Sequence, residues 1–154
     1  MEKCLQFSIF LANKPGVLSQ LFRGLAKAKV NITTLSVMDS SEHGVIRMIV
    51  DSAADTRKVL KKLNFPVQET DVISVTLSNK PGAAADLCDK LSAAHIDIAY
   101  MYCAGGSARG RTVVVIKVPD IKKAVKVLEN NNNKSTRRDM KIKLRRPKTP
   151  ARRR

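Results

Sequence analysis

The sequence is poor in aromatic residues and lacks any long apolar run. Aromatic side chains make up 4% of the 154 residues and tryptophan is absent, so a folded core must be built from Leu, Val, Ile and Ala. No apolar run reaches the roughly 18 residues that a membrane-spanning helix needs, and no basic-then-apolar leader begins the chain. We therefore expect a cytoplasmic protein with no membrane partner.

Residues suited to catalysis or metal binding are also scarce. The three cysteines, Cys4, Cys88 and Cys103, are an odd number without metal-type spacing, which favours buried, reduced thiols. Neither His43 nor His95 is accompanied by a Ser, Cys or carboxylate pair in a recurring motif. We expect no catalytic residue, no metal site and no cofactor, and therefore a protein that is not an enzyme.

Acidic residues are few, and the excess of positive charge is concentrated at one end. The formal net charge is +16, of which residues 134–154 contribute +10, with 11 Lys and Arg against Asp139 alone. Such a segment is expected to be a basic, disordered tail. It could bind nucleic acid through phosphate contacts or be only a solubilising extension, and the sequence leaves both open.

The most informative feature that is present is a repeat. Asn13-Lys14-Pro15-Gly16 recurs 66 positions later as Asn79-Lys80-Pro81-Gly82, and residues 13–37 and 79–103 share eight identities in 25 aligned positions. Unrelated segments would share about one or two. The chain is therefore interpreted as an internal duplication.

Apolar spacing predicts the same order of elements in both units. The first domain, 1–71, is expected to contain a strand, a helix, a strand hairpin, a helix and a closing strand at 67–71. The second domain, 72–133, repeats this order, and its last strand could come only from residues 139–144. The predicted fold class is α+β: two tandem ferredoxin-like βαββαβ units whose antiparallel sheets carry helices on one face.

Each repeated motif lies where a strand gives way to a helix. The N-terminus of a helix carries unpaired N–H groups and about half a positive charge, which together favour an anion such as a carboxylate. Gly16 and Gly82 lack a Cβ, so a ligand could approach the backbone there. Lys14 and Lys80 oppose the helix dipole, a cost that a bound carboxylate would reverse. The alternative is that the motif only caps a helix.

With these residues in view, the chain resembles the ACT domain family. A hydrophobic residue before Asn-Lys-Pro-Gly, then a helix, then Val-Asn-Ile entering a strand is the pattern that carries the resemblance, over about residues 3–129. The doubled arrangement resembles small stand-alone tandem ACT proteins of prokaryotes. The resemblance implies βαββαβ modules that bind a free amino acid between two domains placed edge to edge. The ligand-binding residues that it implies are Asn13, Pro15, Gly16, Asn31, Asn79, Pro81, Gly82 and Asp97.

The resemblance predicts a non-catalytic, amino-acid-binding regulator that works as a homodimer or on a regulated enzyme. Two departures bear on this prediction. Leu11 and Leu77 stand where some members have a polar ligand contact, and Asp97 replaces the second Asn, which leaves open whether the two sites are equivalent. The alternative function is a nucleic-acid-associated regulator that binds through its basic tail.

Overall fold

The computed structural model describes residues 1–12, 14–39, 43–107 and 110–129. The predicted last strand at 139–144 and the predicted tail at 134–154 lie outside these residues. In chain order the elements are β1 (Glu2–Ala12), α1 (Val17–Lys27), β2 (Ile32–Asp39), β3 (His43–Val50), α2 (Ala53–Lys62), β4 (Val67–Ser78), α3 (Ala83–Ala93), β5 (Tyr100–Ser107), β6 (Arg111–Lys117) and a helix at 121–129.

The strands form one six-stranded antiparallel sheet in the order β2-β3-β1-β4-β6-β5. The first four strands of this order, with α1 and α2, are one βαββαβ unit, so the expected α+β fold class is confirmed. The expectation of two separate sheets is not met, because β4 continues without a break through residues 71 and 72. One half of this strand closes the first unit, and the other half opens the second.

The two long central strands serve both units. Residues 67–70 of β4 pair with residues 6–9 of β1 in the first unit. In the second unit, residues 2–4 of β1 pair with residues 72–74 of β4 and so stand in the place of a closing strand. Each unit is therefore completed by a strand that also belongs to the other.

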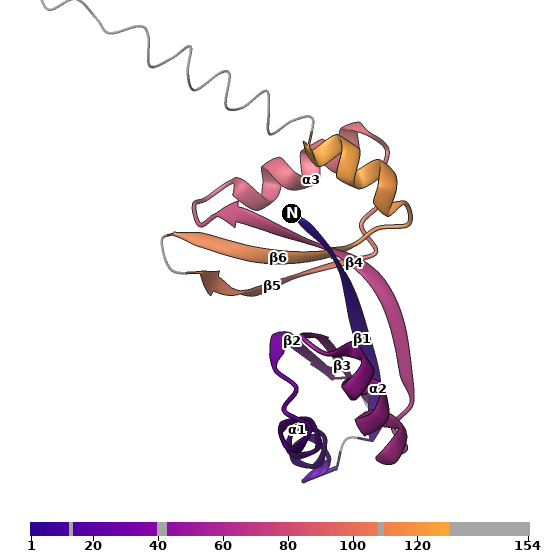
Figure 1. Cartoon of the computed structure of the whole chain (residues 1–154). Helices are drawn as coiled ribbons and strands as arrows, with labels where there is room; N and C mark the ends of the chain where they lie inside the picture. The colour runs from indigo at the N-terminus through magenta and orange to yellow at the C-terminus, as the bar shows by residue number, and fades with distance from the viewer. Residues whose placement is uncertain (13, 40–42, 108–109, 130–154) are drawn as a thin grey trace, which may run out of the picture.

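The helices lie on the outside of the sheet at its two ends (Figure 1). α1 and α2 cover a core formed by Phe7, Ile9, Leu11, Leu21, Leu25, Val30, Ile46, Met48 and Leu60. α3 and helix 121–129 cover a second core formed by Ile73, Leu87, Leu91, Ile96, Val114, Ile116, Val118, Ala124 and Leu128. Both cores are almost entirely aliphatic, as the scarcity of aromatic residues requires.

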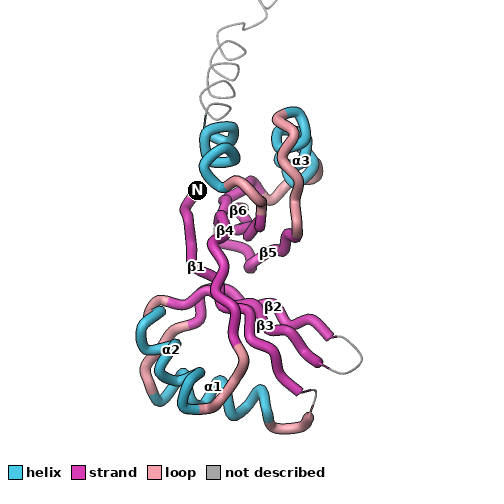
Figure 2. The backbone as a smooth tube through the Cα atoms, turned by 90° about the vertical axis from the view of Figure 1, so that its right-hand side faces the viewer, coloured by secondary structure: helices cyan, strands magenta, loops and turns pink. Residues whose placement is uncertain are grey.

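The faces of the two half-sheets that carry no helix pack against each other (Figures 1 and 2). β2 contacts β5 although the two strands are at opposite edges of the sheet. Buried residues Ile49, Val72 and Val115 form an apolar cluster between them. Beside this cluster Gln6 is fully buried: its amide donates to Tyr100 Oη at 2.7 Å, and its carbonyl accepts from Tyr102 Oη at 3.1 Å. The relative position of the two units is thus held by both apolar and polar contacts.

The apolar spacing predicts a helix from Asp55 to Leu63 with Asp55 as its N-cap, but α2 starts two residues earlier. The helix begins at Ala53 and its N-cap is Ser52, whose Oγ accepts from the Asp55 N–H at 3.4 Å. In the second unit Asp120 accepts from the Lys123 N–H at 2.9 Å and does cap its helix. A Ser placed three residues before the Asp is an equally good cap, so residue type alone does not distinguish the two positions.

Candidate functional site

The two repeated loops have almost the same backbone conformation. In the first, the Lys14 N–H donates to Ala12 O at 2.8 Å, and Gly16 is the N-cap of α1 with φ 87° and ψ −17°. In the second, the Lys80 N–H donates to Ser78 O at 2.9 Å, and Gly82 caps α3 with φ 87° and ψ −19°. Asn13 lies outside the described residues. The duplicated sequence therefore folds into a duplicated structure.

The backbone conformation of the two N-caps is by itself a sufficient reason for glycine at both positions, and no ligand is needed to explain it. A φ of 87° is left-handed, where residues with a Cβ are strained. A Cβ built on Gly16 or Gly82 would meet no atom within 4 Å. A ligand could therefore approach the backbone at either position. A glycine N-cap has no side chain to accept from the first-turn N–H groups, and α1 has no acidic residue in that turn. The N-terminus of α1 thus remains available to an anion.

A cavity of 260 Å³ adjoins the first loop on the side of β2 and β3. Among the described residues its lining is mostly apolar, with Lys14 as the charged member: Leu11, Ala12, Lys14, Val17, Leu18, Val37, Met38, Gly44 and Ile46. A cavity with an apolar wall and a nearby helix N-terminus could accommodate an apolar group attached to a carboxylate.

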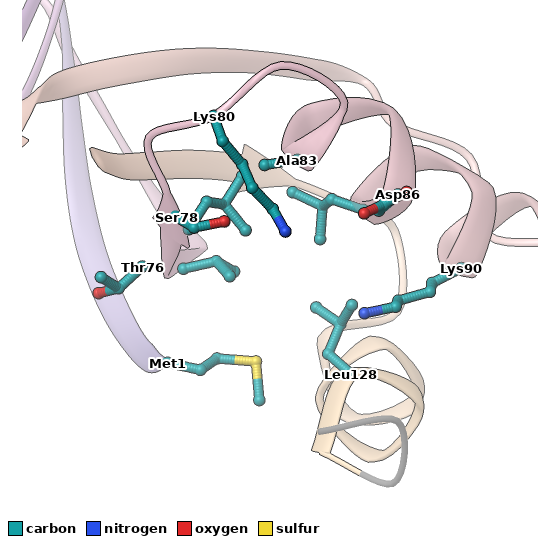
Figure 3. Close-up of a pocket in the computed structure, with 11 residues that line it drawn as sticks. Met1, Thr76, Ser78, Lys80, Ala83, Asp86, Lys90 and Leu128 are labelled. Atoms are coloured by element: carbon teal, nitrogen blue, oxygen red, sulfur yellow. The ribbon is translucent and has the colours of Figure 1, made fainter. Parts of the chain in front are cut away.

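A hollow of 320 Å³ adjoins the second loop (Figure 3). It lies between α3, helix 121–129 and the end of β4, and the side chains of Lys80 and Lys90 extend into it from two sides (Figure 3). Asp86 lines it as well. Its mixed charges distinguish it from the apolar cavity beside the first loop.

The two cavities are nevertheless lined in part by equivalent positions of the repeat. Four positions of the repeat line both of them: Leu11, Ala12, Lys14 and Val17 in the first unit, and Leu77, Ser78, Lys80 and Ala83 in the second. The remaining lining differs, because the first cavity extends toward the hairpin and the second toward the last helix. The two sites are therefore not equivalent in shape or charge.

Asn31 and Asp97 lie at the other end of the helices. Each follows a left-handed residue that ends the helix, Lys29 with φ 56° and His95 with φ 52°. The Asn31 N–H donates to Asp51 Oδ1 at 2.9 Å, and Asp97 lies in a separate hollow with Cys88 and Ser92. Eleven residues of α1 separate its two ends, about 16 Å at 1.5 Å per residue.

The predicted ligand residues therefore do not form one site within a unit. Pro15 and Gly16 lie together, as do Pro81 and Gly82, but Asn31 and Asp97 are a helix length away from the loop of their own unit. α1 and α3 lie at opposite ends of the molecule in both views (Figures 1 and 2). A single amino acid could contact one of the two loops together with Asn31 or Asp97 only if the loop and that residue belonged to two different units.

The described residues hold little that could carry catalysis or a metal. Among them, no group of three or more His, Cys, Asp and Glu side chains could hold an ion. His95 is exposed in the turn after α3, and the three cysteines are free. No helix in this part of the chain has the length and apolar character to span a membrane.

Sequence reasoning missed the apolar side chains that complete the first cavity. Leu18, Val37 and Met38 lie on α1 and β2 and are exposed. In the sequence they read as ordinary members of an amphipathic helix and a strand. The sequence does not show that these side chains are exposed, because their exposure depends on which strand lies at the edge of the sheet.

Comparison with known families agrees with this architecture. A family model described as an ACT domain pair matches residues 2–142. A comparison with the curated proteins finds no match.

Solved structures share the fold over most of the chain. Protein BT0572 from Bacteroides thetaiotaomicron is 34% identical, with a TM-score of 0.78 over 84% of this chain and 89% of that one. The regulatory subunit of aspartate kinase from Thermus thermophilus, in a ligand-free form, is 13% identical, with a TM-score of 0.60 over 84% and 91%. The corresponding subunit from Thermus flavus is 14% identical, with a TM-score of 0.56 over 84% and 96%.

Proposed function

Because the chain belongs to the ACT domain pair family, we propose that it is a non-catalytic regulator that binds a free amino acid at its β1–α1 loop. The observation that carries the proposal is the N-terminus of α1, which has a glycine cap, no acidic residue in its first turn and an adjoining cavity of 260 Å³. The similarity to regulatory subunits of aspartate kinase supports a regulatory role, as does the lack of a metal-type cluster among the described residues.

The chemistry of the first loop suits an amino acid with an aliphatic side chain. Its carboxylate would accept from the backbone N–H of Gly16 and from N–H groups in the first turn of α1, where the helix dipole favours negative charge. Its side chain would enter the cavity between Val17, Val37 and Ile46. Apolar lining gains free energy only from an apolar group, so a charged side chain should bind poorly.

A second copy of the chain would supply the remaining contact. β2 is an edge strand of the sheet, and Leu18, Leu35 and Val37 along that edge are 40%, 41% and 53% exposed. A long apolar edge strand favours pairing with another strand. We therefore propose that two copies pair through β2 about a two-fold axis.

This pairing would join the two halves of the predicted site. The first loop lies beside the end of β2, since Lys14 and Val37 line the same cavity, and Asn31 lies at its start. In an antiparallel pair of β2 strands, the end of one faces the start of the other. The loop of one copy then approaches Asn31 of the partner subunit, whose amide could bind the ammonium group of the ligand.

Ligand binding would thereby act as a regulatory signal. A ligand that contacts two copies stabilises one arrangement of the pair over others, and a regulated enzyme that reads this arrangement would respond to the amino acid. The alternative role in nucleic-acid binding concerns the basic tail, which lies outside the described residues, and stays a prediction.

Calorimetric titration with each of the twenty amino acids tests the proposal. Saturable binding is expected for one or a few aliphatic amino acids, and Val37→Trp should abolish it by filling the cavity. Cys103→Trp changes the same repeat position in the second unit and is the matched control, which should bind as the wild type does. Absence of heat with every amino acid, or equal binding by both variants, would refute the site.

A further inference from the structure

A groove between α1 and α2 lies on the outside of the first unit, separate from the cavity beside the first loop. The two helices lie side by side there (Figures 1 and 2), and the groove has a volume of 470 Å³. None of the described residues that line it also lines the cavity of the first loop. The proposed amino-acid site therefore does not account for this groove.

The groove has an apolar floor and a basic rim. The residues of the floor are half-buried, and those of the rim are exposed. Gly24, Ala28, Val59 and Leu63 form the floor, and Gln20, Arg23, Lys27 and Lys62 form the rim. Together these residues form the basic groove. The described residues that line it include no carboxylate, so it combines an apolar surface with an unbalanced positive charge.

The cations of the rim form no ion pair with a carboxylate in the described part of the chain. α1 contains no Asp or Glu, and the one acidic residue of α2, Asp55, pairs with Lys58 instead. The Arg23 Nε–H donates to a neutral group, Ser19 Oγ, at 3.3 Å. The positive charge of the rim is thus available to a partner.

The fold itself requires neither the charge nor the apolar floor. Asp89 stands at the repeat position of Arg23, which reverses the charge, and Lys90 stands at that of Gly24. A Cβ built on Gly24 would lie 3.0 Å from side chains of α2 and of its C-cap, so glycine lets the two helices approach closely at the floor. The second unit forms the same pair of helices without this glycine and this charge, so the basic groove needs another explanation.

We propose that the basic groove binds an acidic, amphipathic helix of a partner protein. Apolar side chains of that helix, spaced three and four residues apart, pack onto Val59 and Leu63. Its Asp and Glu side chains pair with Arg23, Lys27 and Lys62. The proposal names the chemistry of a regulated target, and it rests on the proposed function only in assuming that the chain acts on such a target.

The composition of the groove favours this partner over the alternatives. A nucleic acid could pair with the rim, but its phosphates would leave the apolar floor without a contact. The described lining also includes no aromatic residue on which a base could stack. The chain's own residues 134–154 carry a charge of +10 and would be repelled. Apolar packing and carboxylate pairing together require a segment that is both acidic and amphipathic.

Fluorescence anisotropy with the full-length chain and a labelled synthetic peptide tests the proposal. The probe is a peptide of about 16 residues with Leu at spacings of three and four and Glu elsewhere. Arg23→Gln with Lys27→Gln should weaken its binding by about tenfold or more. Lys122→Gln with Lys126→Gln removes the same charge, at the same spacing, from helix 121–129 and should bind as the wild type does. All four side chains are exposed, so both variants should keep the wild-type urea midpoint.

A second peptide, in which Ser replaces every Leu, tests the apolar floor. It should bind more weakly than the first by about tenfold or more, because it keeps the carboxylates but has no group to pack onto the floor. Equal binding of the two peptides would overturn the proposal. An equal loss in both variants would also overturn it, since binding would then depend on overall charge and not on the groove.

Two further outcomes would assign the groove to another occupant and thus overturn the proposal. One is tighter binding of a single-stranded oligonucleotide of the same charge, lost when Arg23 and Lys27 are replaced, which would indicate nucleic acid. The other is a loss of self-association in that variant, which would indicate a second copy. The measurement involves no amino acid, so its failure and the failure of the amino-acid titration are distinguishable.

Discussion

Leu5 lies directly opposite Asp71 where β1 pairs with β4, and the two residues occupy the same position of the repeat. The rest of the pairing is symmetric about them: Glu2 is opposite Ser74, and Ser8 is opposite Gln68. Glu2 and Gln68 occupy the same position of the repeat, as do Ser8 and Ser74, so the 66-residue shift between the units converts one pair into the other. An approximate two-fold axis therefore passes between Leu5 and Asp71 and relates one unit to the other.

Gln6→Leu should destabilise the protein by about 1–3 kcal/mol, because it leaves the hydroxyls of Tyr100 and Tyr102 without their partner in a buried site. Burial raises the pKa of Tyr102, so its hydroxyl remains a donor at neutral pH. Urea unfolding measures the change. Tyr100→Phe with Tyr102→Phe in the Gln6→Leu background should restore part of the stability, and a fully additive loss would contradict the network.

Gly16→Ala should destabilise the protein by about 1–2 kcal/mol in the absence of any ligand, because φ is 87° there. Gly82→Ala should have a similar effect. Ser19→Ala, at an exposed position of α1, is the control and should change stability little. If Gly16→Ala left the urea midpoint unchanged, the left-handed cap would be wrong. The variant is thus unsuitable as a test of ligand binding, unlike Val37→Trp.

Glu69→Gln should lower stability at neutral pH but not in acid. Arg57 of α2 forms two hydrogen bonds with Glu69, at 2.6 and 2.7 Å, and holds the pKa of that carboxyl below its usual value. A lowered folded-state pKa stabilises the protein above the unfolded value of about 4.3, and the effect is lost as pH falls through the folded value.

The wild type and Glu69→Gln should therefore differ in urea unfolding at pH 7 and converge near about pH 3. The difference should be smaller than that of Gln6→Leu, since both side chains are partly exposed. A difference that persisted unchanged in acid would assign the effect to packing rather than charge.

Leu35→Lys should weaken self-association, because it places a charge on the exposed apolar edge of β2. Analytical ultracentrifugation over a range of concentrations would show a shift toward monomer. Met101→Lys is the matched control: it alters the same repeat position on the other edge strand, β5, where the side chain is also exposed. Equal effects of the two substitutions would exclude a specific role for β2.

Local patterns were sufficient to predict the elements and the repeated loops. The Asn-Lys-Pro-Gly motif located both strand-to-helix turns, and the structure confirms the α+β class and the antiparallel sheet with outer helices. Start positions were less accurate: the apolar pattern predicts a strand over residues 97–103, but β5 begins at Tyr100. Residues 97–99 precede the ladder of β5 with β6, although the Ala99 N–H already donates to Lys117 O at 2.9 Å, and apolar spacing does not indicate where strand pairing begins.

Relationships between distant residues could not be predicted from such patterns. Gln6 occupies a polar position of an alternating strand, a position typical of a solvent-facing side chain, but the second unit covers it. Likewise, the repeat predicts a helix between Gly16 and Asn31 and another between Gly82 and Asp97, but it does not indicate which unit could bring a residue of the Asn31 type to a given loop. Burial and distance depend on how the sheet bends, which no local spacing encodes.

The sharing of β1 and β4 also bears on the origin of the chain. A peptide of one unit has no fourth strand of its own, because that strand is supplied by the first residues of the other unit. Two such peptides could complete each other by the same exchange about the same axis. The present chain has the arrangement that duplication and fusion of a symmetric, strand-exchanged homodimer would produce. In such a chain the two loops can differ, and here the loop beside Val37 adjoins an apolar cavity while its counterpart adjoins a hollow lined by Lys80, Asp86 and Lys90.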